Sequence, residues 1–441
     1  MSQREIVSVT ARQIYTMRGH PGVEATVVTR GGAKGTALCT SGISVGVHEV
    51  PFCLDGGPRW GGRGVTKAVE NINRTIAPKL IGMDASKQFE VDQALLQICP
   101  DAKRELGGNA IAAVSAAVLK AGAASLDIPL YRHIGGENAM YLPVPGVHSV
   151  VGHERYGGGV TEPGGKPSYS FTCYDFSSYS EASYAAWEVQ QLWQAKMKAM
   201  GIYPPNRFDA YVVPEGYFDS DEELWQMMAE TICEAGYEGR IGIQVDAAAN
   251  CYYDAQAGVY RGLFSRKEKT TEELMELYKY AVSHYPFVII EDPFQEEDYE
   301  SHARLVKEID IQVVGDDLFT TDPERLAHGA ALGAANTVLL KVNQIGTISE
   351  AFEMVQLAYR LGYGVMPCES RGEAESIADY CKRAGRETLL CFLPCLFSVS
   401  ACLWSDCRKG EAVCGRAVRP DRPAGFKRGR DSGEPEKALT I

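Results

Sequence analysis

Residues 287–293 read FVIIEDP, an apolar run that ends in two acids and a proline. Four other short apolar runs occur in the second half of the chain, with helix-like segments between them: residues 242–245, 312–314, 337–342 and 364–366. Strands that are apolar on both faces and alternate with helices are typical of a parallel sheet covered on both sides. The pattern predicts a β/α barrel, and a doubly wound open sheet is the alternative that periodicity leaves open.

Helix-start signals lie between these runs. Ser220 and Thr270 are each followed three residues later by a glutamate, which is the spacing of a capping box. Asp322 stands directly before Pro323, and proline is favoured at the first position of a helix. These signals predict three helices that begin directly after Ser220, Thr270 and Asp322.

Charged residues stand at the ends of four of the apolar runs. Asp246, Glu291 and Asp316 follow the first three along the chain, and Lys341 lies at the end of the fourth. Because the C-terminal ends of barrel strands face one mouth, we expect these side chains to converge. Three carboxylates form an oxygen cage that suits Mg²⁺, and a lysine held neutral beside a cation can act as a base. The alternative is that each acid only caps the helix after it.

The first 140 residues have a different organisation. Two segments alternate apolar and polar residues, as half-buried antiparallel strands do: residues 6–15 and 23–30. Two helical patterns follow, at residues 65–80 and 110–126, and the second is apolar nearly all round. We expect an α+β domain over residues 1–140 and the barrel over residues 141–381.

The composition indicates a soluble, acidic, cytoplasmic protein. The 441 residues include 44 basic and 57 acidic side chains, for a net charge of −13, which argues against nucleic-acid or anionic-membrane partners. The chain begins without an apolar leader, and we find no apolar run that is long enough to span a membrane. The 13 cysteines lack the paired spacing of zinc sites, which is typical of reduced thiols.

Several long strings resemble those of the enolase family, the phosphopyruvate hydratases of glycolysis. They lie at residues 11–14, 18–21, 41–49, 62–80, 106–132, 290–294, 314–318 and 339–347. The resemblance covers about residues 5–380. It implies an α+β N-terminal cap domain followed by an α/β (TIM-like) barrel, a homodimer, and the conversion of 2-phosphoglycerate to phosphoenolpyruvate, a small phosphorylated acid.

The resemblance also implies two Mg²⁺ ions per active site. Asp246, Glu291 and Asp316 match the ligands of the first ion. Ser44 matches the residue that reaches the second ion when substrate closes the site. Two divalent ions suit this chemistry, because a proton next to a carboxylate is very weakly acidic.

The catalytic and substrate-binding positions are implied in the same way. Lys341 matches the general base that removes the C2 proton, and Glu215 matches the general acid that helps the C3 hydroxyl to depart. Ser41, Ser370 and Arg371 match positions that bind the substrate.

Other positions depart from the family pattern. Tyr156 stands where the family has a histidine, Ser170 where it has a catalytic glutamate, and Glu369 where it has a phosphate-binding histidine. The second barrel lysine, expected near Leu390, is absent. Two alternatives to enolase activity follow: a paralogue that applies the same chemistry to another carboxylate, and a catalytically silent binding protein with this fold.

The likeness to the family stops after Asp379. Residues 382–441 are rich in cysteine, arginine and proline, and no histidine lies beyond His328. We interpret these residues as an atypical C-terminal segment that is disordered or produced by a change of reading frame near Cys381.

Overall fold

The computed structural model describes residues 2–16, 19–42, 45–138, 142, 144–151, 155–157, 166–203 and 211–368. Several residues named above lie outside this part of the chain: Ser44, Glu369, Ser370, Arg371 and Leu390. The segment 382–441 also lies outside it.

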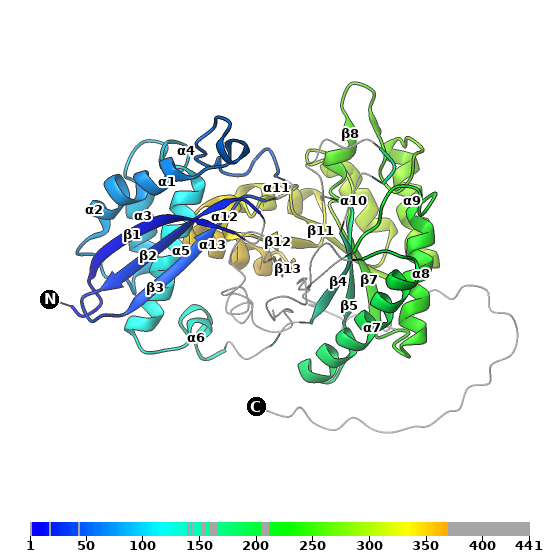
Figure 1. The fold of residues 1–441 in the computed structure, drawn as a ribbon, viewed down its shortest axis with the longest axis horizontal. Helices are drawn as coiled ribbons and strands as arrows, with labels where there is room; N and C mark the ends of the chain where they lie inside the picture. The colour runs from blue at the N-terminus through cyan, green and yellow to red at the C-terminus, as the bar shows by residue number, and fades with distance from the viewer. Residues whose placement is uncertain are drawn as a thin grey trace, which may run out of the picture.

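The N-terminal domain is a three-stranded antiparallel sheet with helices packed on it (Figure 1). The strands are β1 (Ile6–Tyr15), β2 (Pro21–Thr29) and β3 (Lys34–Cys39). The helices are α1 (Thr66–Asn71), α2 (Ala77–Leu80), α3 (Gln88–Leu96), α4 (Ala102–Leu106), α5 (Gly108–Ser125) and α6 (Leu130–Gly135), with a π-helical turn (Ile72–Ile76) between α1 and α2. Helix α5 is the buried helix that the sequence predicted. It approaches β3 so closely that a Cβ at Gly35 would lie 2.1 Å from the carbonyl oxygen of Ala117.

The second domain is built on an eight-stranded sheet in the order β13-β12-β11-β10-β7-β5-β4-β6. The strands are β4 (Gly146–Val151), β5 (Ser168–Cys173), β6 (Tyr211–Val212), β7 (Ile241–Asp246), β10 (Phe287–Glu291), β11 (Gln312–Gly315), β12 (Thr337–Leu340) and β13 (Gly364–Pro367). From β7 to β13 the strands follow chain order and pair in parallel, as predicted. A doubly wound sheet reverses its order at a switch point, so that alternative was wrong.

Strand β5 was not predicted, and it runs antiparallel to both of its neighbours, β4 and β7. Its register places Ser168 opposite Asp246, at the C-terminal end of β7. Lys166 and Pro167, which directly precede β5, therefore lie at the C-terminal end of β7.

The helices of this domain begin close to where the sequence predicts. They are α7 (Tyr179–Ala199), α8 (Asp221–Glu234), α9 (Thr271–His284), α10 (Tyr299–Glu308), α11 (Pro323–Leu332), α12 (Val342–Ile345) and α13 (Ile348–Arg360), and a small hairpin joins β8 (Tyr253–Asp254) to β9 (Val259–Tyr260).

Thr270 forms its capping box, and Asp322 accepts hydrogen bonds from two backbone amides. The capping box at Ser220 was wrong, because Ser220 pairs in a β-bridge with Ser265 and Glu223 accepts instead from the Asp219 amide.

None of the described helices combines the length and the apolar character that a membrane crossing needs.

A buried carboxylate joins the two domains. Asp92 of α3 accepts hydrogen bonds from the Ser115 hydroxyl at 2.6 Å and from the backbone and hydroxyl of Ser349, in α13, at 2.9 and 2.7 Å. Gln88 donates a further bond to the same group at 3.0 Å. Since Asp92 is fully buried, burial raises the pKa of its carboxyl. The two bonds from Ser349 hold α3 against the barrel domain, and the other two fix the carboxylate within the N-terminal domain.

Replacing this carboxylate should destabilise the whole chain. We expect Asp92→Ala to lower the free energy of unfolding by about 2–4 kcal/mol, because it leaves several buried donors without an acceptor. Urea unfolding followed by circular dichroism measures the change. Glu90→Ala, which removes an exposed carboxylate from the same helix, should change the value by less than about 0.5 kcal/mol. Equal effects of the two substitutions would contradict the role of Asp92.

Candidate active site

Three carboxylates meet at the C-terminal ends of neighbouring strands. Asp246 ends β7, Glu291 ends β10 and lies opposite Asp246, and Asp316 follows β11. All three are at most 8% exposed. The helices that follow these strands take their caps from other residues: Thr270, Asp298 and Asp322. The capping alternative was therefore wrong for these acids. Glu291 lies opposite Asp246, whereas the acids with oxygens within 4.8 Å of one another are Asp292, Asp316 and Asp317, so the convergence of Asp246, Glu291 and Asp316 on one ion stays a prediction.

Two lysines neutralise part of this charge. The Nζ of Lys341 forms a buried ion pair with Oδ2 of Asp316, and the Nζ of Lys166 forms one with Oδ2 of Asp246. Gln344 donates to the second oxygen of Asp316 at 2.7 Å. Charged groups that leave water need such partners, because an unpaired buried charge is costly.

Asp292 binds the backbone of the turn that follows β11. Its two carboxylate oxygens accept the backbone amides of Asp316 and Asp317 at 2.9 and 2.8 Å, and its own φ of +42° lies in the left-handed region. Oxygens of these three aspartates lie within 4.8 Å of one another. Burial, reinforced by the neighbouring acids, raises the pKa of Asp292 well above its ordinary value. Asp292 thus orients the turn that carries Asp316.

The electrostatics favour a bound cation. Burial raises the pKa of Glu291 to about 7, although Lys166 and Lys341 oppose the shift. Burial together with the charge of Asp316 raises the pKa of Asp317 to about 8. Carboxylate oxygens are the ligands that Mg²⁺ prefers, so the chemistry of this acidic cluster, in which oxygens of Asp292, Asp316 and Asp317 lie within 4.8 Å of one another, suits such an ion.

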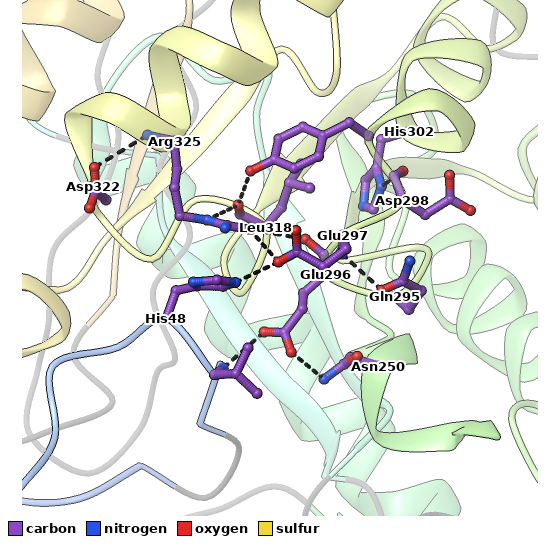
Figure 2. A network of polar contacts seen from close by, with 12 residues as sticks. His48, Asn250, Gln295, Glu296, Glu297, Asp298, His302, Leu318, Asp322 and Arg325 are labelled. Atoms are coloured by element: carbon purple, nitrogen blue, oxygen red, sulfur yellow. Dashed lines mark hydrogen bonds and ion pairs between the residues drawn. The ribbon is translucent and has the colours of Figure 1, made fainter. Parts of the chain in front are cut away.

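A loop of the N-terminal domain is fastened to the rim of the site (Figure 2). The Val47 amide donates to Glu296 Oε2 at 3.0 Å, and His48 Nε2 lies 2.5 Å from Glu297 Oε1. A Cβ on Gly46 would lie 3.0 Å from Asp317, so the loop touches the acids directly. Residues 46–48 are therefore held over the carboxylate cluster.

Comparison with known proteins identifies the family. The model described as "Enolase, N-terminal domain" matches residues 6–134, and the one described as "Enolase, C-terminal TIM barrel domain" matches residues 176–382. The enolase of Methanocaldococcus jannaschii is 42% identical over 383 residues, which is 85% of this chain and 88% of that protein. The enolases of Pyrococcus furiosus (42% over 386 residues; 85% and 87%) and Corynebacterium kroppenstedtii (39% over 382 residues; 85% and 88%) are also similar.

The chain belongs to the enolase family. Its fold is that of an enolase, with an α+β N-terminal domain and a TIM barrel. Enolases are carbon–oxygen lyases, and the buried acids and Lys341 provide polar groups suited to such an enzyme at the mouth of the barrel.

The other predicted enolase residues lie in different surroundings. Glu215 is exposed, and its carboxylate lies 2.5 Å from Nη2 of Arg266. Ser41 Oγ lies 3.4 Å from Nε2 of His20, in the N-terminal domain. The structure thus brings Lys341 together with the acids, whereas Glu215 pairs with a surface arginine.

Two departures from the enolase pattern have local partners. Ser170 Oγ lies 3.1 Å from Nδ1 of His148, on the neighbouring strand β4. Tyr156 donates to Oδ1 of Asp221 at 2.8 Å, and Arg155 forms a buried ion pair with the same carboxylate. Both side chains are therefore integrated into the fold around the site.

The sequence analysis did not predict three contacts at the site: those of Lys166 with Asp246, of Gln344 with Asp316, and of Asp292 with the amides of residues 316 and 317. Lys166 precedes β5 in a stretch rich in glycine and proline, which has no periodicity to mark it. Gln344 lies within the string that resembles the family, and Asp292 directly follows Glu291, but neither position reveals its contact.

His148 should make stability fall on the acid side of neutrality. Burial lowers the pKa of His148 to about 4 in the folded chain. Between about pH 6.5 and pH 4 the imidazole is therefore protonated in the unfolded chain but not in the folded chain. The stabilisation is present above pH 6.5 and should be lost as the pH falls to 4, by about 3 kcal/mol. Urea unfolding between pH 7.5 and 4.5 measures this loss. His148→Gln should reduce it and the exposed His284→Gln should not, and identical slopes in all three proteins would refute the assignment.

Proposed function

We propose that this chain catalyses the Mg²⁺-dependent dehydration of 2-phosphoglycerate to phosphoenolpyruvate. The observation that supports it most is the buried cage of Asp246, Glu291 and Asp316 with Lys341 against it. These three carboxylates would hold Mg²⁺, which when bound stabilises the negative charge that develops on the substrate carboxylate. Two ions per active site, a homodimer and a cytoplasmic location, as implied by the resemblance, belong to the same proposal.

Lys341 is proposed as the base that takes the C2 proton on its Nζ. To accept that proton the amine has to be neutral, so its ion-pair proton must leave first, which a cation bound among the acids would favour. Its backbone amide donates to Thr321 Oγ1 at 2.9 Å, and the Thr321 hydroxyl donates to Gln344 at 2.7 Å. These bonds fix the main chain from which the lysine extends, so its amine is directed at the acids. A base has to be held within hydrogen-bond reach of the proton that it removes.

Glu215 is proposed as the acid that gives a proton to the departing C3 hydroxyl. Its ion pair with Arg266 is exposed on both sides, and exposed pairs of this kind are weak. The carboxyl group is therefore free to turn toward a substrate. Ser41, Ser44, Ser370 and Arg371 are proposed substrate and second-ion contacts.

The direct test is the formation of phosphoenolpyruvate from 2-phosphoglycerate, followed by its ultraviolet absorbance, with and without Mg²⁺. We expect turnover that requires Mg²⁺ and that falls by about 10²–10⁴-fold in Lys341→Ala, because the proton then has no acceptor. Lys198→Ala, which removes an exposed lysine from α7, should retain full activity.

The outcomes separate the alternatives. Turnover of non-phosphorylated hydroxy acids in preference to 2-phosphoglycerate would replace the proposal with a paralogue of different specificity. Mg²⁺ binding without turnover of any acid would replace it with a silent binding protein.

Ser170 offers a gain-of-function test. Because Ser170 stands where the family has a glutamate, we expect Ser170→Glu to raise kcat on 2-phosphoglycerate by about tenfold or more. The new carboxylate would extend from β5, the strand that Lys166 precedes and that pairs with β7. Steady-state kinetics of this variant and of Ser170→Gln, which has the same shape without the charge, measure the effect. An equal change in both variants would show that the carboxylate is not the limiting group.

A further inference from the structure

We propose that Lys166 is a tethered cation that competes with the metal ion for Asp246, and that metal binding displaces its ammonium group from that carboxylate. The inference rests on the proposed function only in treating Asp246, Glu291 and Asp316 as the metal ligands. It assigns to Lys166 the control of how tightly the site binds a divalent cation.

The fold delivers Lys166 to the metal ligands from outside the parallel sheet. Strand β5 pairs antiparallel with β7, and Ser168 lies directly opposite Asp246. Lys166 is two residues earlier, so it lies just past the C-terminal end of β7, where its Nζ reaches Asp246. An antiparallel neighbour is the arrangement that brings the start of one strand to the end of the next.

The backbone of Lys166 is held in place, whereas its ammonium group can move. The Tyr252 hydroxyl donates to the backbone carbonyl of Lys166, and Tyr252 is itself buried. The Nζ pairs with Oδ2 of Asp246, while the lysine side chain keeps 16% of its surface exposed. A long lysine stem with partial exposure can move its ammonium group into water without moving its backbone.

The positive charges near Asp246 show why Lys166 and a metal ion would compete. Within the described part of the chain, the ammonium groups recorded in ion pairs with the three ligands are those of Lys341, on Asp316, and Lys166, on Asp246. The charge of Lys166 extends to the middle carboxylate, since it also lowers the pKa of Glu291. A divalent ion bound among the three acids would lie against the same oxygen as the Lys166 Nζ. Two cations in a poorly hydrated site repel strongly, so one has to leave.

Competition and an ordinary structural ion pair predict opposite changes in Mg²⁺ affinity when Lys166 is removed. If Lys166 only held Asp246 in place, its removal would loosen the site and weaken Mg²⁺ binding. If Lys166 competes for Asp246, its removal leaves an uncompensated carboxylate, so Mg²⁺ binds more tightly and the metal-free protein becomes less stable.

The test is a Mg²⁺ titration of the full chain, without substrate, by isothermal calorimetry. We expect the Kd of Lys166→Met to fall about tenfold or more below that of the unsubstituted protein, because the repulsion between close cations is removed. Lys166→Arg keeps the charge and should remain near the original value. Lys267→Met, which removes an exposed lysine and so changes the net charge equally, should stay within about twofold.

A melting experiment keeps the inference testable if Lys166→Met folds poorly. Without Mg²⁺ this variant should melt below the unsubstituted protein, and saturating Mg²⁺ should remove most of the difference. A Kd that is unchanged or raised, or a melting difference that Mg²⁺ leaves intact, would overturn the inference.

Activity on 2-phosphoglycerate is scored separately. Tighter Mg²⁺ binding by Lys166→Met in a chain that does not turn over 2-phosphoglycerate would uphold this inference and reject the proposed function. Normal turnover with an unchanged Kd would do the reverse. If neither protein binds Mg²⁺, both are rejected.

Discussion

The mutual repulsion of buried carboxylates is the constraint on which the rest of the active site depends. Asp246, Glu291 and Asp316 meet because their strands are parallel neighbours, and burial removes the water that would screen them. Lys166 and Lys341 each offset one of the three carboxylate charges, and burial still raises the pKa of Glu291 to about 7. A site with this residual charge is adapted to a cation.

The same charges couple the two domains. Gln344 donates to Asp316 and, at 3.3 Å, to Glu49 of the N-terminal domain, and its own carbonyl accepts the Val50 amide at 2.9 Å. Residues 46–48 touch Asp317, Glu296 and Glu297 at the rim. The N-terminal loop is thus bound to the barrel through acidic side chains. Its position therefore depends on the charge that the acids carry.

The sequence predicts what regular geometry determines. Apolar runs and their spacing give the parallel strands, and the rule that strand ends share one mouth places Asp246 beside Glu291. Contacts made by loops and turns could not be predicted from the sequence. Lys166 meets Asp246 only because β5 reverses direction, and no local pattern encodes a pairing between strands about 75 residues apart. Asp292 was visible as an acid, but its role depends on two backbone amides that only the folded turn presents.

The metal ligands and the positions that depart from the family are constrained by different forces. Removing Asp246 or Asp316 would leave Lys166 or Lys341 without its counter-charge, so stability itself favours keeping these two acids. Ser170 and Tyr156 instead make ordinary hydrogen bonds, to His148 and Asp221, that satisfy them within the fold. The fold therefore tolerates change at these two positions far more easily than at the cage. Substitution at Ser170 or Tyr156 thus leaves the ion pairs of the acids intact.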